Sequence, residues 1–215
     1  MIVFQNVTKI YKTTREPKIV LDDISTIIPT DRNVGILGRN GAGKSTLLRL
    51  IAKADRPTYG RIHSGARISW PMAFSGGFHP GLSVIDNIRF ISRIYNADWR
   101  ASVEKVEDFA ELGTYLHMPT NSLSSGMRAR LNIGMSLAIH FDVYIMDEIP
   151  GVGDARFKQR FDLAFTNLRH KSSLILISHS PETIRKHCDT AFLLHQGNMT
   201  RFDNIEEALE VHKVS

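Results

Sequence analysis

The sequence predicts an α/β fold with a mainly parallel sheet and an antiparallel β part at the N-terminus. Short apolar segments typical of buried strands alternate with helix-like segments, as in parallel sheets covered on both faces. A glycine-rich stretch at residues 38–45 lies between one such strand and a helix. Residues 2–7 instead alternate apolar and polar side chains, which is typical of a half-exposed strand.

Hydrophobic periodicity and turns rich in Gly and Pro place the elements along the chain. The expected order is strands at 2–7 and 19–28, a buried strand at 33–37, a helix at 45–52, two short strands within 60–70, an ordered loop at 71–82, helices within 84–140, a strand at 141–147, a helix at 155–170, a strand at 173–178, a short helix at 181–188, a strand at 191–194, and a final hairpin and helix at 204–212. Apolar residues recur at helical spacing from Val84 to Leu112. We therefore expect a helical subdomain at about 84–140, inserted in a single domain of residues 1–215.

The composition is that of an ordinary globular protein with a modest excess of positive charge. Of 215 residues, 42% are hydrophobic, and the net charge is +5. Lysine and arginine are spread without a run of five, so we expect a solvated surface and no nucleic-acid partner. Cys188 is the single cysteine, which fits a reducing compartment.

Membrane-directed segments are not expected in this sequence. No apolar run reaches the roughly 20 residues of a membrane-spanning helix, and the first residues lack the pattern of a signal peptide. If the protein works at a membrane, we expect another chain to span it.

The stretch Gly38-Arg39-Asn40-Gly41-Ala42-Gly43-Lys44-Ser45 matches the phosphate-binding loop of nucleotide hydrolases, G-x-x-x-x-G-K-[ST]. Glycines let backbone N–H groups turn inward around a phosphate, and the helix N-terminus adds the positive end of its dipole. Lys44 would reach the outer phosphates, and the Ser45 hydroxyl would bind Mg²⁺. The expected nucleotide contacts of this segment are Gly38, Asn40, Gly41, Ala42, Gly43, Lys44, Ser45 and Thr46.

Two further strands end in residues that can act on a bound nucleotide, because ligands sit at the carboxyl ends of parallel strands. Asp147 can hold Mg²⁺ directly or through water, and Glu148 can take a proton from an attacking water. The alternative is a strand-end acid that caps the next helix. His179 follows another strand and can hydrogen-bond a γ-phosphate or the attacking water, although most lone histidines are structural.

Leu123-Ser124-Ser125-Gly126 opens a helix and offers a second anion site, because serine is a good N-cap and glycine lets a ligand approach the backbone. The alternative is simply a capped helix. Tyr11 can stack on an adenine base, although a tyrosine after a strand is commonly a packing residue.

In this order, the motifs resemble the nucleotide-binding subunit of ABC transporters, and the resemblance covers essentially the whole chain. It implies a P-loop ATPase that uses ATP and Mg²⁺ and works as a head-to-tail dimer. Ser124 and Gly126 then belong to the signature, which contacts the ATP of the second copy. Asp154 falls on the D-loop aspartate of the family, His179 on its switch histidine and Tyr11 on its adenine platform.

The sequence departs from the family pattern at two glutamines. The chain has only Gln5, Gln159 and Gln196, so the loop entering the helical subdomain lacks the usual glutamine. Ser75 is the expected substitute there and a further candidate Mg²⁺ ligand. Met127 stands where the signature has its glutamine. Both departures resemble the polysaccharide-export branch. Several O-antigen exporters of that branch carry an extra carbohydrate-binding domain, and because we expect none here, the resemblance favours the capsule type.

The resemblance implies an ATPase that drives polysaccharide, in particular capsular polysaccharide, across the bacterial inner membrane from its cytoplasmic face. The implied partners are a second copy, a membrane-spanning permease and export proteins that span the periplasm. One alternative is an exporter of O-antigen or another lipid-linked glycan. Another is a non-transport P-loop ATPase, although the roughly 80 residues between the motifs leave no room for a long coiled coil. A P-loop kinase would not need the signature helix.

Overall fold

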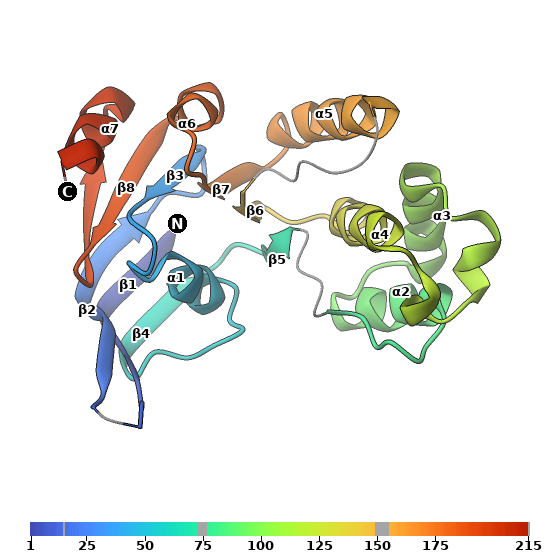
Figure 1. Cartoon of the computed structure of the whole chain (residues 1–215), viewed down its shortest axis with the longest axis horizontal. Coiled ribbons are helices and arrows are strands. Elements are labelled where there is room, and N and C mark those ends of the chain that lie inside the picture. Colours follow the sequence, from blue (N-terminus) through green and yellow to red (C-terminus); the bar gives the residue numbers. More distant parts are fainter. Residues whose placement is uncertain (15, 73–76, 149–154, 215) are drawn as a thin grey trace. The chain divides into compact units, whose positions relative to one another are not determined.

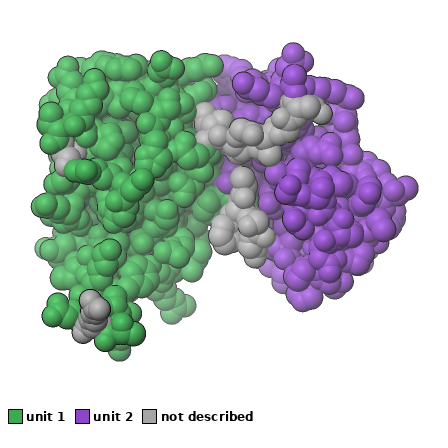
Figure 2. All heavy atoms as spheres, in the orientation of Figure 1, with its two compact units in different colours: residues 1–71, 141–149, 172–215 green, residues 72–140, 150–171 purple. Residues whose placement is uncertain are grey.

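The computed structural model describes residues 1–14, 16–72, 77–148 and 155–214. Figure 1 shows the elements in chain order, and Figure 2 shows that they form two compact units. The first unit takes its residues from 1–71, 141–149 and 172–215, and the second from 72–140 and 150–171. The expected helical insertion at 84–140 lies in the second unit, which also includes the helix that follows residue 154.

The N-terminal strands of the first unit form a three-stranded antiparallel sheet in the order β2-β1-β4. β1 (Ile2–Tyr11) pairs with β2 (Lys18–Ile28) and with β4 (Tyr59–Ser64). β1 continues four residues past the strand expected at 2–7, because its end pairs with β2 in the register Tyr11↔Lys18. The end of this strand mixes polar and apolar residues and is stabilised by hairpin pairing, which local hydrophobic alternation does not reveal.

The second sheet of this unit has six strands in the order β5-β6-β7-β3-β8-β9. Its members are β5 (Ile68–Met72), β6 (Val143–Asp147), β7 (Ser173–Ile177), β3 (Val34–Leu37), β8 (Thr190–His195) and β9 (Asn198–Phe202). β6 pairs with β7, and β3 with both β7 and β8, in parallel, whereas β9 runs antiparallel to β8. The predicted α/β class with a mainly parallel sheet and a separate antiparallel part is therefore confirmed.

β5 continues through Pro71 to Met72, where the sequence predicted that a loop had begun. Proline lacks a backbone donor, and within sheets it is tolerated mainly on edge strands. β5 is an edge strand of the six-stranded sheet, so Pro71 fits at this position.

The core of the first unit joins both sheets to helix α1 (Lys44–Ile51). All four residues of β3 are buried, as the apolar strands of parallel sheets are when helices cover both faces. α6 (Pro181–His187) and α7 (Ile205–Val214) complete the helices of this unit, and α7 packs near β3, β8 and β9. The parallel pairing of β3 and β6 with β7 brings the carboxyl ends of these three strands to the same side of the sheet, where the candidate site residues lie.

The second unit is built from helices. Its elements are α2 (Val84–Ile94), α3 (Trp99–Ala110), the short helices η2 (Gly113–His117) and η3 (Thr120–Ser122), α4 (Ser125–Ala138) and α5 (Ala155–Arg169). The chain turns between α2 and α3, where Asn96 has a φ of 50° and the Asp98 carboxylate accepts from the N–H of Arg100. α4 packs along α3, and the rings of Phe109 and Phe157 meet edge to face at 5.1 Å, which ties α5 to α3. Within the ranges given above, no helix is both long and apolar enough to cross a membrane.

Candidate functional site

The phosphate loop connects β3 to α1, and two of its glycines set its path. A side chain at Gly38 would place its Cβ 2.5 Å from the carbonyl oxygen of Leu194. Gly43 has a φ of 107°, and a Cβ there would lie 2.7 Å from Cγ1 of Val20. The loop can therefore pass this close to β2 and β8 only with glycine at these two positions.

Lys44 is the first residue of α1 and is 8% exposed. Its ammonium group donates to the carbonyl oxygens of Gly38 at 2.7 Å and Arg39 at 3.1 Å. Burial lowers the pKa of Lys44, and the carboxylates of Asp147 and Glu148 offset part of that lowering. The ammonium group thus lies over the loop, within electrostatic reach of Asp147, which ends β6, and of Glu148, which follows it.

The Ser45 hydroxyl and the Asp147 carboxylate lie together at the carboxyl ends of the parallel strands. The Ser45 hydroxyl donates to Oδ2 of Asp147 at 3.4 Å. A hydroxyl and a carboxylate are hard oxygen ligands, and Mg²⁺ commonly takes only one or two from the protein and the rest from water and phosphates. The described part of the chain holds no cluster of three or more His, Cys, Asp or Glu side chains suited to a metal. The pair fits a Mg²⁺ ion that arrives with a nucleotide.

Glu148 directly follows β6 and turns toward the end of β7. Its φ is 68°, and its N–H donates to the carbonyl of Ile177 at 2.9 Å. Its carboxylate accepts from the Ser178 hydroxyl at 3.1 Å and from the N–H of His179 at 2.8 Å. Both carboxylate oxygens are therefore held by the segment that carries the predicted switch histidine.

Most of the residues predicted in this unit line one pocket of about 360 Å³. The lining residues are Tyr11, Lys18, Val20, Asn40, Gly41, Gly43, Lys44, Ser45, Thr46, Asp147 and His179. Gly38 and Ala42 support the loop behind this lining, and Glu148 lies beside His179. The structure thus gathers residues from four separate parts of the sequence around the phosphate loop.

Three residues at this site were not predicted from the sequence. Lys18 and Val20 line the pocket because β2 pairs with the end of β1. Ser178 holds Glu148, and its position immediately before His179 was the available signal.

The predicted signature residues lie in the second unit, at the start of α4. The Ser124 hydroxyl accepts from the N–H of Met127 at 3.2 Å, so Ser124 is the N-cap, and Gly126 lies in the first turn. Both residues are exposed and line a pocket together with Arg130, Arg156 and other residues. Ser75 and Asp154, the other predicted contacts, lie outside the described residues.

A comparison with known families defines the class of protein. Residues 21–150, more than half of the chain, match the model of the ABC transporter family. The chain belongs to this family, and the predicted family and enzyme class, an ABC-type ATPase, are confirmed.

Individual relatives narrow the class further. The chain is 45% identical over 212 residues to the capsule polysaccharide export ATP-binding protein CtrD of Neisseria meningitidis serogroup B, covering 99% of this chain and 98% of the relative. It is 42% identical over 216 residues to the polysialic acid transport ATP-binding protein KpsT of Escherichia coli, covering 99% of each. These relatives match the chain along its length and agree with the predicted polysaccharide-export branch.

A solved structure shares the fold. The dimeric post-hydrolysis state of the ATP-binding cassette MJ0796, bound to ADP and Pi, matches with a TM-score of 0.76. The match covers 94% of this chain and 98% of the other at 21% sequence identity. At this level of identity the likeness concerns the fold.

Proposed function

We propose that this chain is the ATP-hydrolysing subunit of an exporter that drives capsular polysaccharide across the bacterial inner membrane. The observation that carries this proposal is the pocket in which the phosphate loop, Asp147 and His179 come together. The full-length similarity to capsule polysaccharide and polysialic acid transport proteins supports the choice of substrate class.

In this proposal the phosphate loop and Lys44 bind the triphosphate of ATP. Lys44 exchanges its contacts with the loop carbonyls for contacts with the outer phosphates, and loop N–H groups hold the remaining oxygens. Ser45 and Asp147 would hold Mg²⁺, which neutralises charge that builds on the phosphates during transfer. Tyr11, at the pocket wall, provides a surface for the adenine base.

Glu148 is the proposed general base and His179 the proposed contact of the γ-phosphate. Two donors from the end of β7 fix the orientation of the Glu148 carboxylate, as a base that must meet a water molecule in one direction requires. The same segment places His179 in the pocket wall. Proton removal and phosphate contact would therefore depend on one short stretch of backbone.

The remaining predicted residues are assigned to the dimer or to Mg²⁺. Ser124, Gly126 and Asp154 would contact the ATP bound to a second copy, and Ser75 stays a candidate contact of Mg²⁺. The chain would sit at the cytoplasmic face of the inner membrane, attached to a membrane-spanning permease. Export proteins that span the periplasm would complete the path of the polysaccharide.

A genetic test separates this function from its alternatives. Deletion of the gene in its source bacterium should remove capsular polysaccharide from the cell surface and leave O-antigen in place. The wild-type gene should restore the capsule, and Lys44→Ala should not. Loss of O-antigen with an intact capsule would favour the lipid-linked glycan alternative. In a separate assay of the purified chain with ATP, a phosphorylated small-molecule product in place of free phosphate would favour a kinase.

A further inference from the structure

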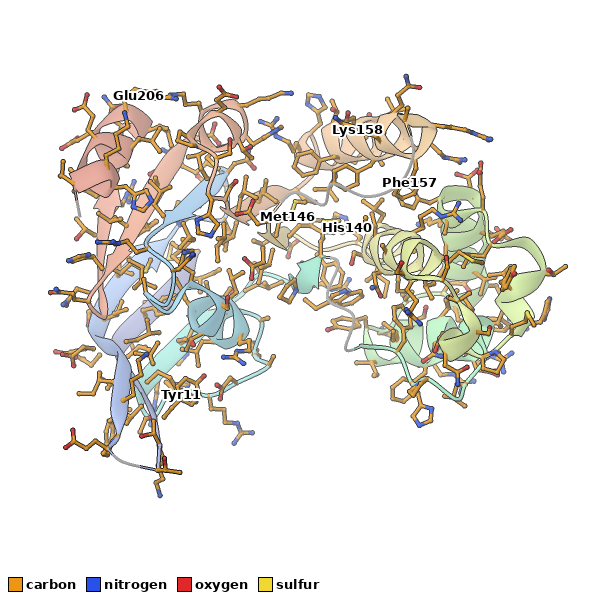
Figure 3. The ribbon with its side chains drawn as sticks, in the orientation of Figure 1. Tyr11, His140, Met146, Phe157, Lys158 and Glu206 are labelled. Carbon is orange, nitrogen blue, oxygen red and sulfur yellow. The ribbon has the colours of Figure 1, made fainter. Side chains whose placement is uncertain are left out.

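Tyr11 is held at its hydroxyl end as well as by its strand. It is the last residue of β1 and lines the phosphate-loop pocket, and Figure 3 labels it near the hairpin between β1 and β2. Its hydroxyl donates to Oδ2 of Asp55 at 2.9 Å, across 44 residues of sequence. A guanidinium nitrogen of Arg49 lies 3.4 Å from the same hydroxyl oxygen and donates to it. The ring is thereby connected to α1, the helix that begins at Lys44.

Asp55 is itself fixed by two other donors. Its Oδ1 accepts from the Lys9 ammonium group at 2.7 Å and from the N–H of Arg56 at 2.7 Å. Lys9 is 9% exposed and also donates to the carbonyl of Arg56 at 2.7 Å. The hydrogen bond from Lys9, with smaller contributions from Arg56 and Tyr11, lowers the pKa of Asp55 to about 2. The carboxylate is therefore ionised at neutral pH and accepts hydrogen bonds at both oxygens.

The same network occupies one face of the tyrosine ring. Lys9 and Tyr11 are two residues apart on β1, so their side chains point to the same side of the sheet. The Lys9 ammonium group lies over the ring, 4.9 Å from its centroid. A base that stacks on Tyr11 would use the face that Lys9 leaves open. Fixing the ring in advance reduces the side-chain entropy that is lost when a base stacks on it.

We infer that Asp55 is a positioning residue for nucleotide binding, which holds Tyr11 as a platform for the base and is itself held by Lys9. This inference rests on the proposed binding of ATP. It assigns the base-binding part of the affinity to a network separate from the phosphate loop. Changes to Asp55 should therefore affect ligands that carry a base and spare ligands that consist of phosphates alone.

The experiment compares ATP with inorganic tripolyphosphate as ligands of the purified chain with Mg²⁺. Asp55→Asn should weaken ATP binding about five- to tenfold, the range expected for losing charge-assisted hydrogen bonds, and leave tripolyphosphate binding unchanged. In steady-state assays KM for ATP should rise by the same factor with kcat unchanged. Asp31→Asn is the matched control, because this aspartate is 78% exposed and its nearest cation lies 4.0 Å away. Asp31→Asn should change the affinity for neither ATP nor tripolyphosphate.

Tyr11→Phe provides a second variant that removes only the hydroxyl group. It should reproduce the selective loss of ATP affinity, and adding it to Asp55→Asn should cause no further loss, because both changes break the same hydrogen bond. Unchanged ATP affinity in both variants, or equal loss of ATP and tripolyphosphate, would overturn the inference while the wild-type chain still binds ATP. A wild-type chain that binds tripolyphosphate but not ATP would overturn the proposed function as well.

Discussion

The backbone N–H of His179 donates a 2.8 Å hydrogen bond to Oε1 of Glu148, although the two residues are 31 positions apart. The contact exists because β6 and β7 pair in parallel, with Asp147 opposite Ile177, so that the next residues of both strands emerge at the same edge. Ser178 adds a second bond to the other carboxylate oxygen. The proposed base and the proposed phosphate contact are therefore parts of one hydrogen-bonded unit.

Replacing Glu148 with glutamine tests the assignment of the base. Glu148→Gln keeps an oxygen that can accept from His179 but cannot take a proton from water. We expect ATP binding to persist and single-turnover phosphate release to fall about 10²–10⁴-fold. Sedimentation with ATP should then show a stable dimer, because the ligand is not consumed. Hydrolysis at the wild-type rate would remove Glu148 from this role.

Ser178→Ala tests whether the orientation of Glu148 matters. The substitution deletes the donor to Oε2 of Glu148 and the acceptor of the Ser180 N–H, and leaves the bond from His179 intact. We expect a fall in kcat of about three- to tenfold with unchanged ATP affinity, in keeping with the loss of one of the two hydrogen bonds that hold the Glu148 carboxylate. In the Glu148→Gln background the same change should have no further effect. Additive effects in the double variant would show that Ser178 acts on something other than Glu148.

Alanine substitutions at two glycines of the phosphate loop should differ in how much they destabilise the fold. Gly43→Ala combines a positive φ with a Cβ 2.7 Å from Val20, whereas a Cβ at Gly41 meets nothing within 4 Å. Both variants carry backbone strain of about 1–2 kcal/mol, and Gly43→Ala should lose about 1–3 kcal/mol more through overpacking. Urea unfolding of the two variants measures this difference. Equal destabilisation would mean that the contact with Val20 relaxes at no cost.

The ion pair of Asp55 predicts a pH dependence of stability. The pKa of Asp55 is lowered from 3.8 to about 2 in the folded protein, so ionised Asp55 favours folding above about pH 4. That contribution is lost as the pH falls from about 4 toward 2. Wild type should exceed Asp55→Asn by up to about 2 kcal/mol at pH 7, and by about half of that at pH 3. A stability difference that is the same at both pH values would contradict the assigned pKa.

Local sequence was sufficient for some parts of this structure and insufficient for others. The course of the phosphate loop could be predicted because its glycines, Lys44 and Ser45 lie within one short stretch, residues 38–45, between an apolar strand and a helix. The strand-end positions of Asp147 and His179 followed from apolar runs. The bonds from Ser178 to Glu148 and from Tyr11 to Asp55 depend instead on which strands pair and where α1 ends. The end of β1 was likewise missed because pairing with β2, and not hydrophobicity, extends it.

Transport itself tests the central claim most directly. Inverted inner-membrane vesicles that carry the permease, with this chain on their outward-facing cytoplasmic surface and capsular polysaccharide supplied outside, should accumulate polysaccharide in their lumen when ATP is added. A non-hydrolysable ATP analogue, or the Lys44→Ala chain with ATP, should give only background accumulation. Equal accumulation with the analogue or with Lys44→Ala would contradict the account, because export would then not depend on hydrolysis at this phosphate loop.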